Sequence, residues 1–375
     1  MYIARWISRN ARRVVSVLIV ASAVLVCSAI TWPLIMHAVA IRTLTDAGWT
    51  LKVGDPRPLW WRKWCGEIGL WHFGHVASVS ASADARPGAS QARQLMALRW
   101  FPELQVVDLG GLSVTDLDVA ALSESRDLVW LRIDSSVVSD SALRVIRRLP
   151  RLVFLDLSNT SIGDNGCLDI AECSQLQNLY LHGTRVSNRG LAYLTRLRAL
   201  KELSLGMTQV TDDGLATLML FPQLESLQLD GTEVRFDGAG TLQGFGTLTF
   251  LSLSSTQVDD ESIISVAALP QLETLYLNGT RLTDACLPAL KQMTKLRELG
   301  LARTDLTDRG FREVATMTGL ESVHVEDTRI SAAVLGELLR LPQLREVFVS
   351  ERQLAEPQID TLARSSLGKG ILQTE

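Results

Sequence analysis

The sequence predicts an α/β solenoid, with a curved parallel sheet inside and short helices outside, preceded by one N-terminal transmembrane helix. Two observations lead to this prediction. A 24-residue unit recurs in one register from Leu104 to the unit that begins at Leu344, and an apolar run at residues 14–41 is free of charged residues. All nine tryptophans lie at or before position 130, which marks a distinct N-terminal region.

Each repeated unit begins with the pattern LxxLxL. In one unit Leu224 is followed three and five residues later by Leu227 and Leu229. Alternation places the second and third apolar residues on one face of a short strand and the residues between them on the other. Eleven units share the pattern, and they begin at Leu104, Leu128, Leu152, Leu176, Leu200, Leu224, Leu248, Leu272, Leu296, Leu320 and Leu344.

The second half of each unit predicts a short helix. A Ser or Thr stands where an N-cap is needed, and Asp often follows it at the positive end of the helix dipole. Leu287 and Leu290 show the i, i+3 spacing of one helical face. The predicted N-caps are Thr115, Ser139, Ser187, Thr211, Thr283, Thr307 and Ser331.

One strand and one helix per unit, always connected in the same sense, stack neighbouring strands in parallel. No unit buries enough apolar surface to be stable alone, so stability must come from stacking. Residues 76–82 and the pair Leu95 and Leu98 predict a degenerate opening turn. We expect an irregular outer segment in the Leu224 unit, where glycines occupy the second half, and a frayed tail at residues 365–375.

The repeat resembles the leucine-rich repeat, with Thr at the position where other members carry Asn or Cys. The segment Thr211-Asp212-Asp213-Gly214-Leu215 is similar to the 24-residue variety of bacterial membrane-anchored leucine-rich repeat proteins. The resemblance covers residues 76–364. It implies the solenoid fold and a role in partner recognition, because the family shares a scaffold rather than one ligand.

The apolar run at residues 14–41 is longer than the roughly 20 residues that a helix needs to cross a bilayer. Four arginines lie in residues 1–13, whereas Arg42 is the only basic residue in the ten residues after the run. This asymmetry predicts a cytoplasmic N-terminus and repeats on the periplasmic or extracellular side. Ala38-Val39-Ala40 leaves open a signal peptide cleaved after Ala40 and a secreted protein.

The predicted organisation has five parts. Residues 1–13 form the basic cytoplasmic N-terminus, and residues 14–41 form the anchor. Residues 42–75 are a Trp-rich linker that either caps the solenoid or lies on the membrane surface. Residues 76–364 are the repeat domain, with one degenerate turn and eleven regular turns, and residues 365–375 are the tail.

Composition and motifs favour a non-enzymatic protein. The net charge of −4 suggests no nucleic-acid partner, and the five cysteines contain no CxxC. The sequence has no GxSxG, HExxH or phosphate-binding loop. We interpret the recurring Asp column as helix-start electrostatics and the recurring Thr column as hydrogen bonding between successive coils. No catalytic residue, metal site or cofactor is therefore predicted.

The candidate binding residues lie between the core positions of the strands, where the repeat does not dictate identity. Trp130, Phe154 and Tyr180 fall on three consecutive strands, and alternation predicts that they are exposed. Exposed aromatics on a rigid sheet are typical of a binding hot spot, although strand propensity alone can also place aromatics there. The predicted binding residues are Trp130, Arg132, Phe154, Asp156, Tyr180, His182, Phe250, Tyr276, His324 and Phe348.

The resulting hypothesis is a non-catalytic protein–protein interaction module on the extracytoplasmic side of a membrane of the bacterial cell envelope, with a protein partner on its concave face. One alternative is an envelope glycan or peptide ligand stacked on the aromatic residues. The others are a secreted binding protein and a solenoid that acts only as a spacer.

Overall fold

The computed structural model describes residues 35–54, 75–80, 91–236, 245–354, 357–364 and 372–374. Most of the expected anchor at residues 14–41, most of the Trp-rich segment and the glycines at positions 238, 240 and 244 lie outside these residues. Among the residues described, no helix has both the length and the apolar character needed to span a membrane. The described residues fall into two compact units, the first within 1–108 and 120–128 and the second within 109–119 and 129–375.

In its described residues the first unit has a helix at residues 35–46, three strands and two shorter helical segments. Its elements are β1 (Thr50–Gly54), β2 (His75–Ser80), α4 (Gln91–Ala97), η1 (Leu98–Trp100) and β3 (Val106–Asp108). β2 and β3 are parallel, with Ser78 opposite Val106, and Leu95 and Leu98 are buried. β1 pairs with β2 in the antiparallel direction, which the sequence did not predict. A strand from the Trp-rich segment thus occupies one edge of β2, and the adjoining Trp49 is buried.

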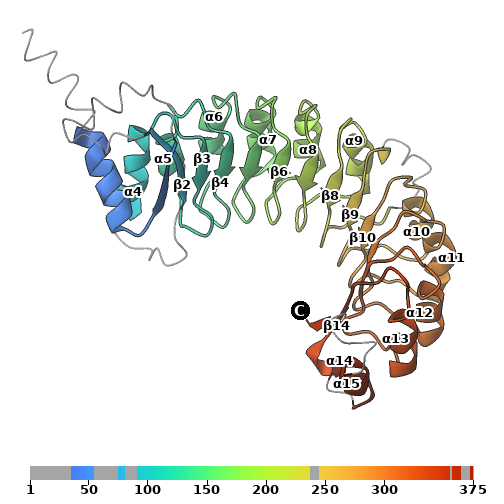
Figure 1. Cartoon of the computed structure of the whole chain (residues 1–375). Helices are drawn as coiled ribbons and strands as arrows, with labels where there is room; N and C mark the ends of the chain where they lie inside the picture. Colours follow the sequence, from blue (N-terminus) through green and yellow to red (C-terminus); the bar gives the residue numbers. More distant parts are fainter. Residues whose placement is uncertain are drawn as a thin grey trace, which may run out of the picture. The chain divides into compact units, whose positions relative to one another are not determined.

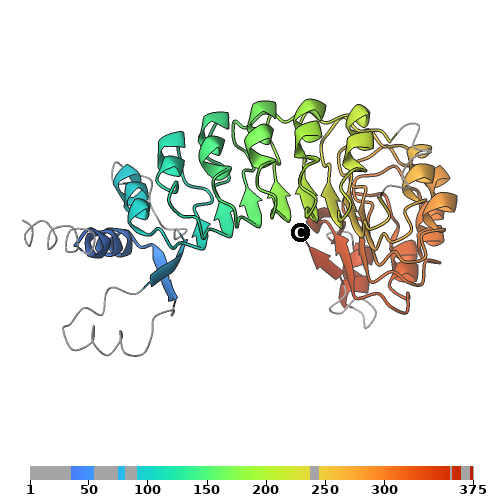
Figure 2. The ribbon, with the colours of Figure 1, turned by 90° about the horizontal axis from the view of Figure 1, so that it is seen from above.

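The second unit is a solenoid in which β4 to β14 follow one another in chain order. From β4 to β13 each strand is parallel to the next and pairs 24 residues further along the chain, as in Trp130 opposite Phe154 and His324 opposite Phe348. The strands lie along the inner side of its curve and the helices along the outer side (Figures 1 and 2). The predicted repeat solenoid of parallel strands and short helices is confirmed here. Its strands are β4 (Trp130–Arg132), β5 (Phe154–Asp156), β6 (Asn178–Tyr180), β7 (Glu202–Ser204), β8 (Ser226–Gln228), β9 (Phe250–Ser252), β10 (Thr274–Tyr276), β11 (Glu298–Gly300), β12 (Ser322–His324), β13 (Glu346–Val349) and β14 (Leu372–Thr374).

The core of this solenoid is made by the apolar positions of the repeat. Leu152, Leu155 and Leu157 of one turn are completely buried, and the equivalent residues of the other turns are buried as well. Because each turn covers the next, the burial that a single turn lacks is supplied by stacking.

The helical segments are short, as predicted. They are α5 (Asp116–Ala120), η2 (Asp140–Ala142), α6 (Leu143–Ile146), α7 (Asp164–Ile170), α8 (Asn188–Leu194), η3 (Asp212–Gly214), α9 (Leu215–Leu218), α10 (Ser262–Val266), η5 (Asp284–Cys286), α11 (Leu287–Leu290), α12 (Asp308–Val314), α13 (Ala332–Leu338), α14 (Glu351–Leu354) and α15 (Pro357–Arg364). Five of the predicted N-caps accept a backbone N–H bond through the side chain: Ser139, Ser187, Thr283, Thr307 and Ser331. Thr211 makes no such cap bond, and its hydroxyl accepts from Asn188 of the preceding coil.

The Asp column lies in the first turns of the helices, as the sequence predicts, and it also bonds to the next coil, whereas the Thr column differs from the sequence interpretation. Asp164 accepts from the backbone N–H of Ser187 at 2.8 Å and from its hydroxyl at 2.7 Å, so the carboxylate joins one coil to the next. Thr160 donates to the carbonyl of Leu157 at 2.6 Å, which is a bond within its own turn. The Asp column therefore links coils, and the Thr column closes individual turns.

The C-terminal end departs from the expected frayed tail. β14 pairs with β13 in parallel, with Gln373 opposite Phe348. The edge of β13 presents backbone N–H and C=O groups that a further strand can satisfy, which is the physical reason for this pairing. Upstream, Ile359 of α15 is completely buried.

Three cysteines in the described residues, Cys167, Cys173 and Cys286, are free and buried. Burial raises the pKa of Cys286 to about 12, and the neighbouring Asp260 carboxylate acts in the same direction. A thiol with such a pKa stays protonated near neutral pH and behaves as a small core residue.

Candidate binding surface

The residues between the core positions of each strand form one surface, which we call the strand face. It consists of the second, fourth and sixth residues after the first Leu of each repeat. Since neighbouring strands pair 24 residues apart, equivalent residues stand beside one another in three rows across the sheet. Trp130 and Phe154 belong to the first row, Arg132 and Tyr180 to the second, and His182 to the third.

The N-terminal aromatic cluster consists of Trp130, Phe154 and Tyr180. The rings of Trp130 and Phe154 are stacked, with centroids 3.4 Å apart and planes 3° from parallel. The ring of Tyr180 lies 5.2 Å from that of Phe154 at an angle of 41°. Trp130 remains 39% exposed. The structure thus brings together the three aromatics that the sequence placed on consecutive strands and leaves Trp130 accessible.

The polar residues predicted around this cluster are held by intramolecular contacts. Arg132 Nε lies 2.8 Å from Asp134 Oδ1 and 3.7 Å from Asp156 Oδ2, so two carboxylates oppose its charge. Tyr180 donates its hydroxyl proton to Glu202, and burial together with this bond raises the pKa of Tyr180. The phenol therefore stays neutral and oriented.

The imidazole of His182 lies against Gly206 of the next coil. A Cβ atom at Gly206 would stand 2.5 Å from Nδ1 of His182, so the imidazole occupies the space that a side chain at position 206 would need. His182 is therefore positioned by Gly206 and partly exposed.

The C-terminal aromatic cluster consists of Phe250, Tyr276, His324 and Phe348. The rings of Phe250 and Tyr276 meet edge to face at 5.6 Å, and those of Tyr276 and His324 at 5.3 Å. His324 and Phe348 are stacked at 4.2 Å with planes 10° apart. The sequence named all four as candidates. The structure joins them into one chain of rings.

Gly300 makes this chain of rings possible. Tyr276 is on β10 and His324 on β12, with Gly300 of β11 between them in the second row. A Cβ atom at Gly300 would lie 2.5 Å from Cδ1 of Tyr276 and 2.7 Å from Oδ1 of Asn278. Because Gly300 has no side chain, the tyrosine ring extends across its strand to meet His324.

His324 is buried, contrary to the exposure that alternation predicted. Only 8% of it is exposed, because it is stacked against Phe348 and meets the ring of Tyr276. Its Nδ1 lies 3.2 Å from Oε1 of the buried Glu326, and its Nε2 lies 3.5 Å from Oε1 of Glu298. Burial lowers the pKa of His324, but the hydrogen bond to Glu326 and the two carboxylate charges outweigh burial and raise it overall.

The sequence interpretation omitted the carboxylates around the C-terminal cluster. Glu298 accepts the hydroxyl proton of Tyr276, Glu326 lies in the turn after β12, and Glu346 lies on β13. All three occupy strand-face positions, so the charge along those positions was the signal that could have identified them. Among the residues that the structure describes, no group of three His, Cys, Asp or Glu side chains is arranged to hold a metal ion.

Comparisons with known proteins support the repeat architecture. The leucine-rich repeat family matches residues 150–171 and 197–219. The comparison with curated proteins yields no match. An internalin of Listeria monocytogenes is similar in structure, with a TM-score of 0.56 and 17% identity over 80% of this chain and 86% of the internalin. At this identity the likeness concerns the fold.

Two further solved structures are similar at lower scores. A leucine-rich repeat protein of Leptospira interrogans gives a TM-score of 0.49 and 16% identity, covering 75% of this chain and 74% of that protein. The other is the ectodomain of an Arabidopsis thaliana membrane receptor kinase, solved in complex with CASPARIAN STRIP INTEGRITY FACTOR 2. It gives a TM-score of 0.49 and 18% identity, covering 74% of this chain and 39% of the ectodomain. Leucine-rich repeat proteins are generally binding modules without catalytic activity.

Proposed function

We propose that this protein is a non-catalytic interaction module that binds a protein partner on its strand face. We further propose that an N-terminal anchor at residues 14–41 displays the repeats outside the cytoplasm. The observation that supports binding most directly is the exposed stack of Trp130 on Phe154. Large aromatic side chains are enriched among the residues that dominate interface energetics.

The N-terminal aromatic cluster is well suited to binding because its rings are already ordered. Trp130 and Phe154 are held by strand pairing and by stacking on each other, and Tyr180 is held by its bond to Glu202. A side chain that is ordered before association loses little rotamer freedom when a partner covers it. On this rigid sheet, little of the free energy gained from apolar contact is lost to ordering side chains. More of that free energy therefore contributes to affinity.

The test begins with full-length protein used to capture partners from cell envelopes, after which one captured partner is purified. We expect Trp130→Ala and Phe154→Ala each to weaken its binding by about 2 kcal/mol, or roughly thirtyfold. Ile264→Ala is the matched control, because Ile264 is an apolar residue of α10, outside the strand face, and is 65% exposed. Equal weakening by the control would contradict the proposal, and so would failure to capture any partner.

The same exposed stack also favours a second candidate, an envelope glycan whose sugar rings lie on Trp130. Binding of purified envelope polysaccharide by protein-free preparations, lost in Trp130→Ala, would favour the glycan over the protein partner.

A separate experiment tests whether the protein is anchored in a membrane and on which side of it the repeats lie. Membrane fractionation and mass determination of the N-terminus should find an intact N-terminus in the membrane pellet, with repeats accessible to protease added from outside. A soluble form that begins at Ile41 would instead show that the segment is cleaved after Ala40.

A further inference from the structure

The strand face carries an unbalanced charge. From β4 to β13 its three rows contain one arginine, Arg132, two histidines and no lysine. The same rows contain seven carboxylates: Asp134, Asp156, Glu202, Asp230, Glu298, Glu326 and Glu346. The whole chain has a net charge of only −4, so this one surface is more acidic than the composition indicates. A surface of one sign favours partners of the opposite sign.

The carboxylates of the first half of the sheet are largely engaged within the protein. Arg132 lies between Asp134 and Asp156, and Asp230 accepts bonds from Ser252 and Ser254. Their charge or hydrogen-bonding capacity is therefore already used, and they contribute less to recognition than the composition alone suggests.

In the second half of the sheet Glu298 accepts the hydroxyl proton of Tyr276 and lies 3.5 Å from Nε2 of His324, but among the described residues no lysine or arginine balances its charge. Glu298, Ser322 and Glu346 stand side by side in the first row, on three consecutive strands. At a strand spacing of about 4.8 Å, two carboxylates flank the small serine side chain. Beside them in the second row lie His324 and Phe348, while Tyr276 reaches over Gly300 from the other side. Carboxylates next to aromatic rings suit a cation on an apolar stem.

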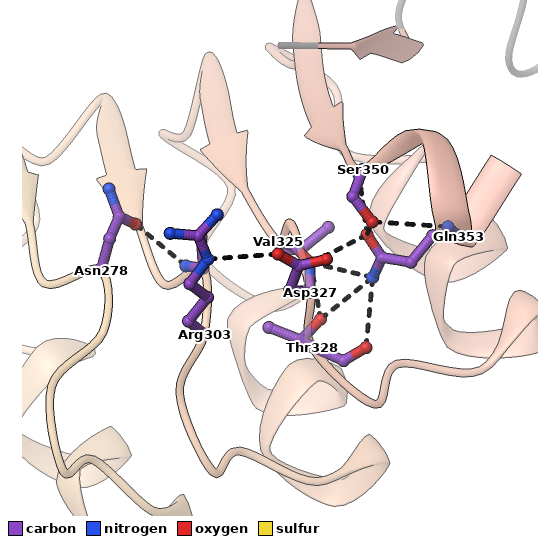
Figure 3. A network of polar contacts seen from close by, with 8 residues as sticks. Asn278, Arg303, Val325, Asp327, Thr328, Ser350 and Gln353 are labelled. Atoms are coloured by element: carbon purple, nitrogen blue, oxygen red, sulfur yellow. Dashed lines mark hydrogen bonds and ion pairs between the residues drawn. The ribbon is translucent and has the colours of Figure 1, made fainter.

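Cationic side chains near this row are directed elsewhere. Arg297 and Arg345 both form salt bridges with Glu321, which precedes the strand face in its repeat, and Arg303 pairs with Asp327 in the loop after it (Figure 3). Among the residues described, neither Glu298 nor Glu346 forms a salt bridge with lysine or arginine. Two buried atoms here, the hydroxyl oxygen of Ser322 and Oε2 of Glu326, also have no hydrogen-bond partner in the described structure.

We infer that the partner contributes a basic segment, one of whose arginine or lysine side chains lies over Ser322 between Glu298 and Glu346. The aliphatic stem of that side chain packs against Phe348 and the guanidinium or ammonium group binds both carboxylates, as charge-assisted pairing favours. This inference rests on the proposed function and specifies the chemistry of the partner. It assigns cation recognition to the C-terminal half of the sheet and apolar contact to the N-terminal aromatic cluster.

The probe is a labelled peptide, acetyl-(Gly-Arg)6-amide, with acetyl-(Gly-Glu)6-amide as its acidic counterpart. Binding to the full-length protein is measured by fluorescence anisotropy at physiological ionic strength, where long-range charge is screened. We expect Glu298→Gln combined with Glu346→Gln to weaken the arginine peptide at least tenfold. Glu346→Gln alone should weaken it severalfold, and because Glu346 is exposed this variant tests the site without disturbing Tyr276.

The matched control combines Glu233→Gln with Glu261→Gln, which removes the same charge from exposed positions outside the strand face. A change below twofold in this control supports the inference. Equal weakening by the two double variants, or equal binding of the acidic peptide, would overturn it. If a captured partner needs Trp130 but binds the Glu298 and Glu346 variants unchanged, the inference fails while the proposed function stands. Failure to capture any partner would instead count against the proposed function.

Discussion

The N-terminal and C-terminal aromatic clusters occupy the same two rows of the strand face, yet they differ in burial and in nearby charge. In the first, Trp130 lies on Phe154 and remains 39% exposed, and Arg132 balances the nearby carboxylates. In the second, His324 is only 8% exposed, and acidic residues surround it without a lysine or arginine in the rows.

The difference shows that the residue on an intervening strand determines whether rings on either side of it can meet. Rings two strands apart are separated by about 10 Å of sheet, too far for contact unless one side chain crosses the strand between them. Gly300 permits Tyr276 to cross, and the ring then meets His324. Trp130 and Phe154, by contrast, lie opposite each other on adjacent strands in the first row and stack directly. A regular scaffold can therefore carry an open surface at one end and a half-buried one at the other.

The largest expected effect concerns the support of the C-terminal cluster. The buried amide of Gln353 donates to the carbonyls of Val325 at 3.0 Å and Thr328 at 3.2 Å and accepts from the backbone N–H of Asp327 and Ser350 (Figure 3). Gln353→Ala leaves these groups without that partner. We expect a loss of about 2 to 3 kcal/mol in the free energy of unfolding of the C-terminal repeats.

Hydrogen exchange measured by mass spectrometry checks this localisation. Exchange should accelerate in β12 and β13 and remain unchanged in β5 and β6, and the exposed Gln343→Ala should leave all four strands unaffected. Equal acceleration at both ends would show that the two clusters are stabilised as one unit.

A somewhat smaller effect is expected at Gly300. Gly300→Ala forces a Cβ atom against the ring of Tyr276, so we expect a loss of about 1 to 3 kcal/mol in urea unfolding. Gly319→Ala is the matched control, because its added Cβ atom would find its nearest neighbour at 3.5 Å, an ordinary contact. Similar losses in the two variants would mean that Gly300 has no special role in joining the rings.

The smallest effect is a pH dependence confined to the C-terminal cluster. The pKa of His324 is raised above its ordinary value of 6.5, so the folded state binds the proton more tightly than the unfolded state. The resulting stabilisation is fully present below about pH 6.5 and is lost as pH rises through the raised pKa. Urea unfolding across this range should show stability falling with pH.

His324→Gln should remove this component of the pH dependence, whereas His182→Gln, the matched control on the other half of the sheet, should retain it. Retention of the full slope in His324→Gln would assign the pH dependence to other groups.

Much of the fold was predictable because the repeat leaves few alternatives. The LxxLxL spacing places Leu152, Leu155 and Leu157 in the core, and nine of the ten candidate residues lie on strands, with His182 just after β6. The interpretation was wrong where contacts rather than spacing decide. Thr160 bonds within its own turn, and residues 372–374 form a strand in the expected tail.

The sequence by itself determined the 24-residue period, the strand and helix of each turn, and which residues face away from the core, because these follow from local spacing and from the handedness of the chain. Only the tertiary structure decided how neighbouring side chains on that face combine. The stack of Trp130 on Phe154 and the burial of His324 depend on residues 24 to 48 positions apart that meet only when coils are stacked in register. The exposure of each side chain depends on the size of its neighbours across the sheet, and spacing along the chain does not encode it.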